Sequence, residues 1–348
     1  MARAPALAQP PSLRLGVVGY GYVAARCHVP ALRYVPGISL VAVSEPNEAR
    51  RSLVPRGVTT AVRWEELVDR PDIDALLISS PSHTHAEIGI RALDSDKHVL
   101  IEKPIALTLH DADRLCYAEQ AAGRVAGVGL HLRHLPLMRR LAKAMVQIGV
   151  PTGGHSAFHN HLRTRKTVSG YERTRTAGGG ALYDLAYHHF DLYSWLFGAH
   201  VASVYCTISS RESDDDIVTT HTTLENGIAI SGSFSSTTTN ENLVTIFGQD
   251  GKVAADMYRS LRPEYRPVLE GNVRRILNNV FSAMPAAGMG LYSLQRVRLA
   301  PFIQQWISFR DAVRGLPNEL PRTGDGRRAL RVVLAAYASA SSRREMSV

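Results

Sequence analysis

A short apolar strand that leads directly into a glycine-rich turn places the strongest limit on the fold of this chain. LRLGVVG is nearly continuously apolar, as buried strands are, and it runs into GYGYVA at residues 19–24. Gly19 allows a tight turn, Gly21 lets the backbone approach a pyrophosphate, and Ala24 still permits close packing of a helix on the strand. The spacing predicts a dinucleotide-binding turn, although short glycine patterns also occur in ordinary turns.

An acidic residue at the end of the second predicted strand supports this interpretation. ISLVAVSE closes with Glu45, about 20 residues beyond the glycines, where such folds bind the ribose diol of a dinucleotide. A carboxylate there repels a 2′-phosphate, and no arginine follows until Arg50. The sequence therefore predicts NAD as the cofactor in preference to NADP. The alternative for Glu45 is a solvated carboxylate at a strand end.

The pattern of strands and helices changes once along the chain. From Leu13 to about Val128, short apolar runs alternate with helical stretches, as in a doubly wound parallel sheet. After about His155, longer runs rich in Val, Thr and Ser indicate an antiparallel sheet, and helical periodicity returns near the end. We expect an α/β protein with a disordered leader (1–12), an NAD(P)-binding Rossmann domain (13–130) and an α+β domain with a large, open, mainly antiparallel sheet and C-terminal helices (131–348).

Composition narrows the class of protein and of partner. The chain has 348 residues, 45% of them hydrophobic and 20% charged, which is ordinary globular usage. It contains no apolar run of about 18 residues and no recognisable signal peptide, so we expect a cytoplasmic protein without a membrane span. Cys27, Cys116 and Cys206 lack paired spacing and are expected to be reduced. The net charge of +9 is spread along the chain, which favours an anionic small molecule over nucleic acid.

Polar residues interrupt an otherwise apolar predicted helix at residues 178–198, GGGALYDLAYHHFDLYSWLFG. Asp184 and His188 are four residues apart, so a helix places them on one face. A histidine oriented by a carboxylate suits the removal of a hydroxyl proton near pH 7. The glycines would allow a tight turn and leave N–H groups near a substrate. The alternative is that these residues cap the start of the helix or are hydrogen-bonded polar residues of the core. For His189 and Asp191, this structural interpretation has the same weight as a functional one.

A lysine follows another predicted strand, in the sequence HVLIEKP. Lys103 thus lies at the carboxyl end of a parallel strand, where such sheets bind ligands. Its ammonium group could donate to a substrate hydroxyl and favour the developing alkoxide. A lysine at a strand end is more often only solvated. Pro104 could carry a cis peptide bond.

Six motifs resemble those of one known family, the oxidoreductases grouped around glucose-fructose oxidoreductase, inositol 2-dehydrogenase and a rhizopine-catabolism protein (Gfo/Idh/MocA). They are GYGYVA, PSHTHAEI, HVLIEKPIALT, LHLRHLP, GGGALYDLAYHHFDL and GRRALRVVLAAYASA. The resemblance implies a Rossmann domain followed by a substrate-binding domain whose open sheet often forms the subunit contact, and hence a homo-oligomer, either dimer or tetramer. The family usually has Asn where this chain has Ser82, so a polar contact near the nicotinamide ribose is expected to differ.

The resemblance also assigns roles to individual residues. Lys103 joins Asp184 and His188 as the catalytic groups. The expected cofactor-binding residues are Gly19, Gly21, Tyr22, Val23, Ala24, Glu45, Ser80, Pro81, His83, His85, Glu102, Lys103 and Arg133. The expected substrate-binding residues are Lys103, His131, Asn160, Arg163, Asp184 and His188.

Two further patterns, the histidines at 155–161 and the acids at 214–216, are not expected to form functional sites. His155, His159 and His161 alternate along one predicted strand, which could suggest a metal. No cysteine or acid has the matching ligand spacing and the relatives use no metal, so none is expected. The acidic run at 214–216 is expected to be a solvated turn.

Together these observations predict an NAD(P)-dependent oxidoreductase that transfers hydride between the nicotinamide and a secondary alcohol or ketone of a sugar, a sugar derivative or a cyclitol. One alternative is a dinucleotide-binding sensor without turnover, since the family includes a galactose-pathway repressor. Another is a reductase or dehydrogenase of a non-carbohydrate substrate. Retention of Lys103, Asp184 and His188 together favours an enzyme, because a sensor needs no acid–base group.

The arginine-rich segment at 257–300 matches no motif of this family that we can identify. Its arginines alternate with apolar residues, so part of it could form a basic amphipathic helix. Packing on the sheet or on another subunit is the plainest interpretation. Binding of an anionic substrate by residues such as Arg274 and Arg275 is the second, and a membrane-surface role is the third.

Overall fold

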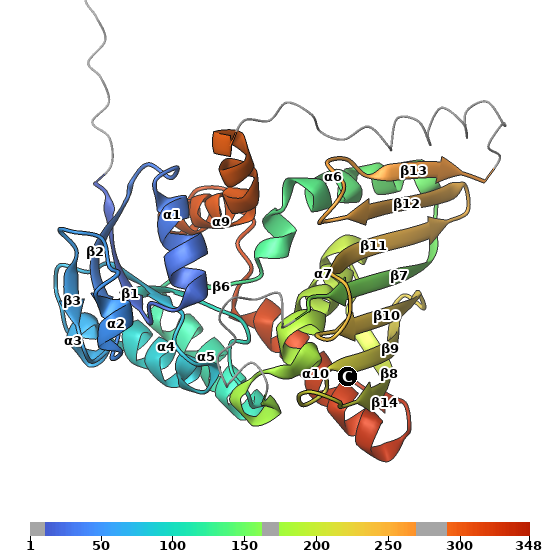
Figure 1. Cartoon of the computed structure of the whole chain (residues 1–348), viewed down its shortest axis with the longest axis horizontal. Coiled ribbons are helices and arrows are strands. Elements are labelled where there is room, and N and C mark those ends of the chain that lie inside the picture. The colour runs from blue at the N-terminus through green and yellow to red at the C-terminus, as the bar shows by residue number, and fades with distance from the viewer. Residues whose placement is uncertain (1–10, 162–173, 269–290) are drawn as a thin grey trace, which may run out of the picture.

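Two sheets of different construction organise the chain, and the computed structural model describes residues 11–161, 174–268 and 291–348 (Figure 1). The first sheet is parallel, with six strands in the order β3-β2-β1-β4-β5-β6. The order reverses beside β1, which confirms the predicted doubly wound arrangement. The strands are β1 (Leu13–Val18), β2 (Ile38–Ser44), β3 (Thr59–Ala61), β4 (Ala75–Ile78), β5 (His98–Ile101) and β6 (Ala126–Val128).

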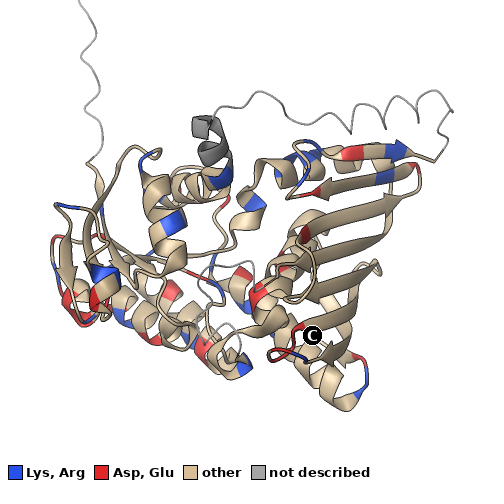
Figure 2. Ribbon diagram, in the orientation of Figure 1, with Lys and Arg blue, Asp and Glu red and all other residues tan. Residues whose placement is uncertain are grey.

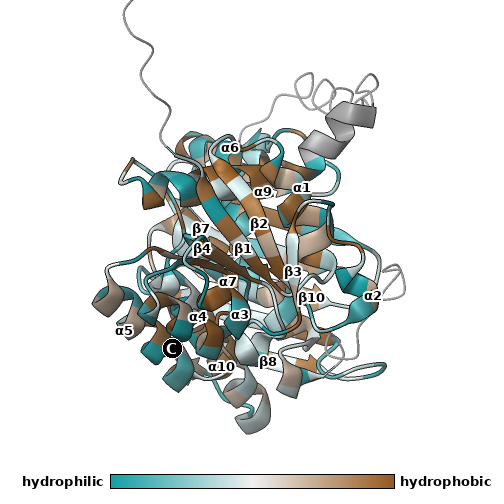
Figure 3. Cartoon of the chain, turned by 90° about the vertical axis from the view of Figure 1, so that its left-hand side faces the viewer, coloured by the Kyte–Doolittle hydropathy of each residue, from teal (hydrophilic) through white to brown (hydrophobic). Residues whose placement is uncertain are grey.

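Helices cover both faces of this sheet, whose strands are strongly apolar (Figure 3). One face packs against α4 (His85–Asp94) and α5 (Leu109–Ala122). The other packs against α1 (Val29–Leu32) and α9 (Leu291–Val313), a helix from near the far end of the chain. Trp306 of α9 is fully buried in the same cluster as Leu15. The short segments of this half are η1 (Ala24–His28), α2 (Glu48–Arg51), α3 (Glu65–Val68) and η2 (Ser82–Thr84).

The second sheet is mixed and open, with eight strands in the order β13-β12-β11-β7-β10-β9-β8-β14. Strands β7 and β10 run parallel and the other neighbours are antiparallel, which confirms the predicted mainly antiparallel sheet. The strands are β7 (Pro151–His159), β8 (Val201–Ser209), β9 (Ile217–Leu224), β10 (Ala229–Ser235), β11 (Glu241–Gly248), β12 (Gly251–Asp256), β13 (Glu264–Pro267) and β14 (Met346–Ser347).

One face of the second sheet packs against helices α6 (Pro136–Ala144), α7 (Tyr187–Phe197) and α10 (Thr323–Ser342). The short segments η3 (His131–His134) and η4 (Met145–Ile148) flank α6. Strands β8, β9 and β10 carry no Lys, Arg, Asp or Glu, and charged side chains gather elsewhere (Figure 2). Among the described residues, no helix is long and apolar enough to cross a membrane.

The predicted helix at 178–198 is less regular than its apolar pattern suggests. Its glycines lie outside the helix, with Gly178 and Gly180 in left-handed backbone conformations. A π-helical turn, η8 (Leu182–Ala186), then leads into α7, which ends at Gly198. A second π-helical turn, η1, follows the glycine-rich turn after β1. Such turns add one residue to a helical turn and often occur at functional sites.

Asp214 is exposed, but Asp215 and Asp216 are buried, so the prediction of a solvated turn at 214–216 was wrong for two of its three acids. The Asp216 carboxylate accepts hydrogen bonds from three successive backbone N–H groups of residues 211–213. Asp215 accepts from the Tyr337 hydroxyl at 2.8 Å, and its carbonyl accepts from Ala181 N at 3.0 Å. These bonds compensate the cost of burying carboxylates and anchor the segment that precedes α7.

Gly180 is expected to be essential for this anchoring. A Cβ atom at Gly180 would overlap the Asp215 carboxyl group, whereas one at Gly198 would meet nothing within 4 Å. Both glycines have positive φ, 84° and 62°, so both Ala variants incur the backbone strain. Gly180→Ala should therefore lower the free energy of unfolding by about 1–3 kcal/mol more than Gly198→Ala. Urea denaturation measures the difference, and equal losses in the two variants would contradict it.

Candidate active site

The glycine-rich turn after β1 has the shape that the sequence predicts for dinucleotide binding. A Cβ atom at Gly19 would come within 2.8 Å of Ser79 O and Ser80 N, so only glycine lets this turn approach the end of β4. A Cβ atom at Gly21 would meet nothing within 4 Å, which leaves the backbone open to a ligand. Ala24 is fully buried, as its packing role requires. The residues present therefore fit a dinucleotide.

Glu45 is buried against this turn, so the alternative of a solvated carboxylate was wrong. Its Oε2 accepts from Tyr20 N at 2.8 Å and its Oε1 accepts from Asn47 N at 3.0 Å. A carboxylate has about four acceptor positions, so capacity remains for a ribose diol. Glu45 therefore orders the glycine-rich turn in addition to its predicted contact with the cofactor.

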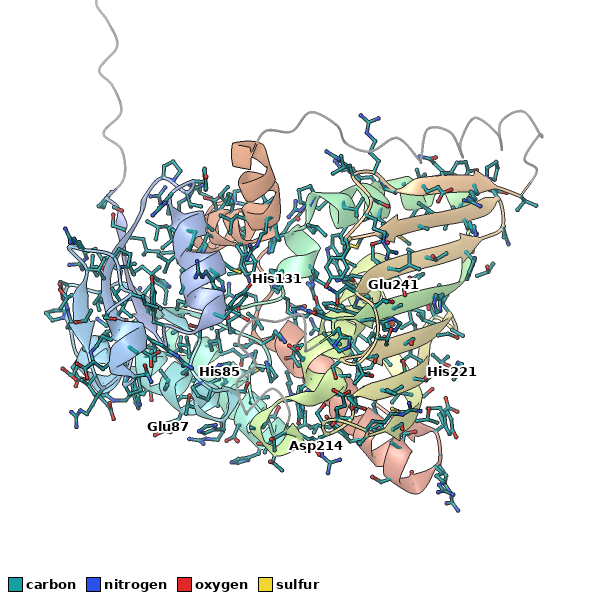
Figure 4. All side chains as sticks on the ribbon, in the orientation of Figure 1. His85, Glu87, His131, Asp214, His221 and Glu241 are labelled. Atoms are coloured by element: carbon teal, nitrogen blue, oxygen red, sulfur yellow. The ribbon has the colours of Figure 1, made fainter. Side chains whose placement is uncertain are left out.

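The loop after β4 is tied to the loop after β5 by a buried histidine. His85 Nε2 lies 2.8 Å from Ser80 O, and its Nδ1 lies 2.7 Å from Pro104 O. The Lys103–Pro104 peptide bond is cis, as the sequence allowed. Figure 4 labels His85 on the side of the first sheet that faces the second. His85 thus positions the loop that carries Lys103. The remaining predicted residues of these turns, Tyr22, Val23, Pro81 and His83, are exposed or half-buried.

Glu102 faces inward, toward the helical segment that follows the glycine-rich turn. Its Oε1 lies 2.7 Å from His28 Nε2, and its Oε2 accepts from Lys103 N at 3.1 Å. Burial acts to raise the pKa of Glu102, but the hydrogen bond with His28 and the nearby His28, His131 and Lys103 together hold it below its ordinary value. Through its contact with His28, Glu102 therefore links the end of β5 to the helical segment that follows the glycine-rich turn. His28 was not among the residues predicted from the sequence.

Lys103 and Asp184 meet between the two sheets. Lys103 Nζ donates to Asp184 Oδ1 at 2.7 Å and to Asp184 O at 2.9 Å. The two side chains are 14% and 28% exposed, so the pair is shielded but still reachable from solvent. The end of β5 and the π-helical turn before α7 thus supply one ion pair, although 81 residues separate them.

His188 lies beside this pair and is buried. Its ring stands edge-on to His131, with centroids 4.9 Å apart. Burial, followed by the charges of Lys103 and His131, lowers the pKa of His188 well below its ordinary value, while Asp184 opposes the shift. The imidazole is consequently neutral and able to accept a proton. The structure brings Lys103, Asp184 and His188 together, but Asp184 pairs with the lysine, a contact that helical spacing alone did not indicate.

His189 and Asp191 have structural partners, which supports the plainer interpretation of both. His189 Nε2 lies 3.0 Å from Asn242 Oδ1, and burial lowers its pKa to about 4. Asp191 accepts two hydrogen bonds from Arg133, whose guanidinium also reaches Asp325. The donors of Arg133 thus join η3, α7 and α10 within the interior, and its expected role in cofactor binding stays a prediction.

The predicted substrate-binding residues are only partly within the described structure. His131 stacks on Phe302 of α9, with ring centroids 4.6 Å apart, and burial lowers its pKa to about 4. Figure 4 labels His131 between the two sheets. Asn160 follows β7, where its backbone N–H donates to Ser235 O at 2.9 Å. Arg163 lies outside the described residues, as do Arg274 and Arg275.

The described ranges contain no group of three or more His, Cys, Asp or Glu that could hold a metal ion. Of the alternating histidines, His159 has partners that explain it, because its Nε2 lies 3.0 Å from Ser233 Oγ and its Nδ1 lies 3.4 Å from Glu241 Oε2.

Comparison with known proteins identifies both halves of the chain. Residues 13–130 match the model of an oxidoreductase family with an NAD-binding Rossmann fold, and residues 139–254 match the GFO/IDH/MocA C-terminal domain. The uncharacterized oxidoreductase YdgJ of Escherichia coli is 33% identical over 195 residues, which is 55% of each chain. The 1,5-anhydro-D-fructose reductase of Ensifer adhaerens is 32% identical over 186 residues, 51% of this chain and 54% of that protein. The chain thus spans about half the length of these two relatives.

A longer match joins the chain to the myo-inositol 2-dehydrogenase of Thermotoga maritima, at 27% identity over 71% of this chain and 76% of that protein. Among solved structures, an oxidoreductase domain protein from Kribbella flavida has a TM-score of 0.83 at 23% identity, covering 97% of this chain and 100% of that chain. A levoglucosan dehydrogenase, in complex with NADH and levoglucosan, has a TM-score of 0.79 at 22% identity, covering 97% and 99%. With the glycine-rich turn and both family models in agreement, the chain belongs to the Gfo/Idh/MocA family of NAD-binding oxidoreductases.

Proposed function

We propose that this protein is an NAD-dependent dehydrogenase or reductase that acts on a secondary alcohol or ketone of a sugar, a sugar derivative such as a nucleotide sugar, or a cyclitol. The observation that carries the proposal is the meeting of Lys103, Asp184 and a buried His188 between the two sheets, where burial and Lys103 lower the pKa of His188. The names of the relatives, an anhydrofructose reductase and an inositol dehydrogenase, support this substrate class.

Each residue of this cluster has a distinct task in the proposed reaction. Bound NAD supplies the acceptor for the hydride that leaves the substrate carbon. An imidazole nitrogen of His188 takes the hydroxyl proton in oxidation and returns it in reduction. Lys103 Nζ donates to the substrate oxygen, which stabilises the developing alkoxide. Asp184 holds Lys103 in place through the 2.7 Å contact. The hydride and the proton together leave a ketone as the oxidised product.

A dinucleotide-binding sensor and a dehydrogenase of non-carbohydrate substrates remain the alternative functions. A sensor requires the glycine-rich turn but has no use for a shielded lysine beside a neutral histidine. A panel of sugars, nucleotide sugars and inositols, followed by absorbance of the reduced nicotinamide with NAD(H) and NADP(H), tests the proposed function against both alternatives. Turnover of none of them, with NADH binding intact, would contradict the carbohydrate assignment and leave the sensor and the dehydrogenase of a non-carbohydrate substrate.

We also propose a homo-oligomer, dimer or tetramer, that forms through the outer face of the second sheet. In its support, β8, β9 and β10 are free of charged residues, and Tyr205 and Phe247 are exposed on the sheet. Large apolar or neutral surfaces of this kind favour association. A monomer in multi-angle light scattering at micromolar concentration would contradict the proposal.

Lys103→Ala, His188→Ala and Asp184→Asn should each lower kcat by about 10²- to 10⁴-fold, the range expected for the loss of an acid–base group. The dissociation constant of NADH should stay nearly unchanged, because these groups act on the proton. Their effects should be non-additive, since the three form one cluster. His189→Gln, which keeps a hydrogen-bonding group beside Asn242, is the control and should retain activity. Near-normal turnover of His188→Ala would remove it from the proton-accepting role.

The pKa of His188 should shift in opposite directions in two variants. Lys103 lowers this pKa and Asp184 raises it, so Lys103→Met should raise it and Asp184→Asn should lower it further. Because the pKa of His188 in the folded protein lies below 6.5, the imidazole keeps its proton-free form at pH 6.5. The value of kcat/KM for oxidation should therefore stay level as the pH falls to 6.5, and decline only when the pH approaches the lowered pKa. NMR titration of histidine-labelled protein measures the shifts. Equal shifts in one direction would show that neither charge acts on His188.

Glu45 should determine the preference for NADH over NADPH. Glu45→Gln removes the negative charge and keeps an acceptor for one of the two backbone N–H groups that Glu45 holds. The ratio of NADPH to NADH dissociation constants should fall about fivefold or more, because like charges about 4 Å apart repel by about 1 kcal/mol even in water. Glu48→Gln, an exposed acid nearby, is the control. Tighter binding of NADPH than NADH by the unaltered protein would refute the predicted preference.

A further inference from the structure

A basic residue of α9 reaches the glycine-rich turn from the opposite end of the sequence. Arg298 Nη2 donates to the Tyr22 hydroxyl at 3.1 Å, although 276 residues separate them. The same helix packs against α1 and η1. One turn further along, the Phe302 ring contacts the edge of His28, with centroids 5.0 Å apart. Arg298 is exposed, but Leu299 and Phe302 of the same helix are buried, which holds Arg298 beside Tyr22.

The guanidinium lies beside the first residues that follow the glycines. Burial raises the pKa of the Cys27 thiol to about 11, and the charge and hydrogen bond of Arg298 oppose this rise. Arg298 therefore lies near both Tyr22, which precedes the helical segment η1, and Cys27, which lies within it.

Arg298 differs in its partners from two other arginines of the C-terminal region, Arg310 and Arg322. Arg310 pairs with Asp311, and Arg322 pairs with Glu119. Within the described ranges, by contrast, no carboxylate lies within ion-pair distance of Arg298. The turn GYGYVA itself contains no Lys or Arg, so its backbone provides N–H donors but no full positive charge.

We infer that Arg298 is a cofactor-binding residue, and that its guanidinium binds the diphosphate of the dinucleotide at the open side of Gly21. The inference rests on the proposed function, because it requires that the chain bind NAD. A guanidinium presents forked donors that match phosphate oxygens, and the Tyr22 hydroxyl orients it. The C-terminal half of the chain thereby supplies the charge that the glycine-rich turn lacks.

Titration calorimetry with NADH, ADP-ribose and adenosine tests this role without any measurement of turnover. Arg298→Ala should weaken NADH and ADP-ribose about tenfold, the effect of losing one charge-assisted hydrogen bond. Adenosine, which has no diphosphate, should bind equally well to the variant and to the unaltered protein in a competition titration. Arg298→Lys should be intermediate, since it keeps the charge without the fork. The salt dependence of NADH binding should also decrease in Arg298→Ala.

Arg331→Ala removes the same charge from an exposed position on α10 and is the matched control. Tyr22→Phe removes only the hydroxyl and should weaken NADH less than Arg298→Ala does. Unchanged ADP-ribose affinity in Arg298→Ala, or an equal loss for all three ligands, would overturn the inference, because the arginine would then only tether α9 to the turn. If the unaltered chain binds no NADH, the proposed function fails together with the inference.

Discussion

The ion pair between Lys103 and Asp184 determines the geometry of the whole candidate site. It joins the end of β5 in the first sheet to the π-helical turn that precedes α7 in the second half. Because Lys103 Nζ also donates to the Asp184 carbonyl, the lysine fixes the backbone of that turn as well as its side chain. His188 then lies in a setting where burial and a neighbouring cation keep it neutral. This single ion pair thus brings Asp184, the proton acceptor His188 and the end of β5 together.

Local sequence was sufficient for the elements and for the glycine-rich turn. The apolar runs of β1 and β2 and the glycines between them follow rules of strand periodicity and turn geometry, so both the parallel sheet and the turn could be predicted. Local sequence was not sufficient to predict that Lys103 lies beside Asp184 and His188. Helical spacing linked the last two, but only the family resemblance brought Lys103 to them, because contacts between distant segments leave no local periodicity.

The contacts that sequence reasoning missed are buried, and most of them join distant segments. Asp215 and Asp216 look like a polar turn, yet backbone N–H groups donate to the Asp216 carboxylate and the Tyr337 hydroxyl donates to one oxygen of Asp215. Arg133 was expected to bind the cofactor, and the structure shows that Asp191 and Asp325 accept from its guanidinium. These buried charged residues have partners that offset part of the cost of their desolvation. The partners of Asp216 are neighbouring backbone groups, whereas those of Asp215 and Arg133 lie far away in sequence.

The return of α9 to the first sheet sets an order of events during synthesis. Strands β1 to β6 are complete by Val128, but Trp306 and Phe309, which share a core cluster with Leu15 and Val17, are synthesised much later. Domains generally fold as units from the N-terminus, and a sheet with one uncovered apolar face is prone to aggregation or chaperone capture. A prematurely terminated product would carry the complete glycine-rich turn on a sheet that cannot bury its own core.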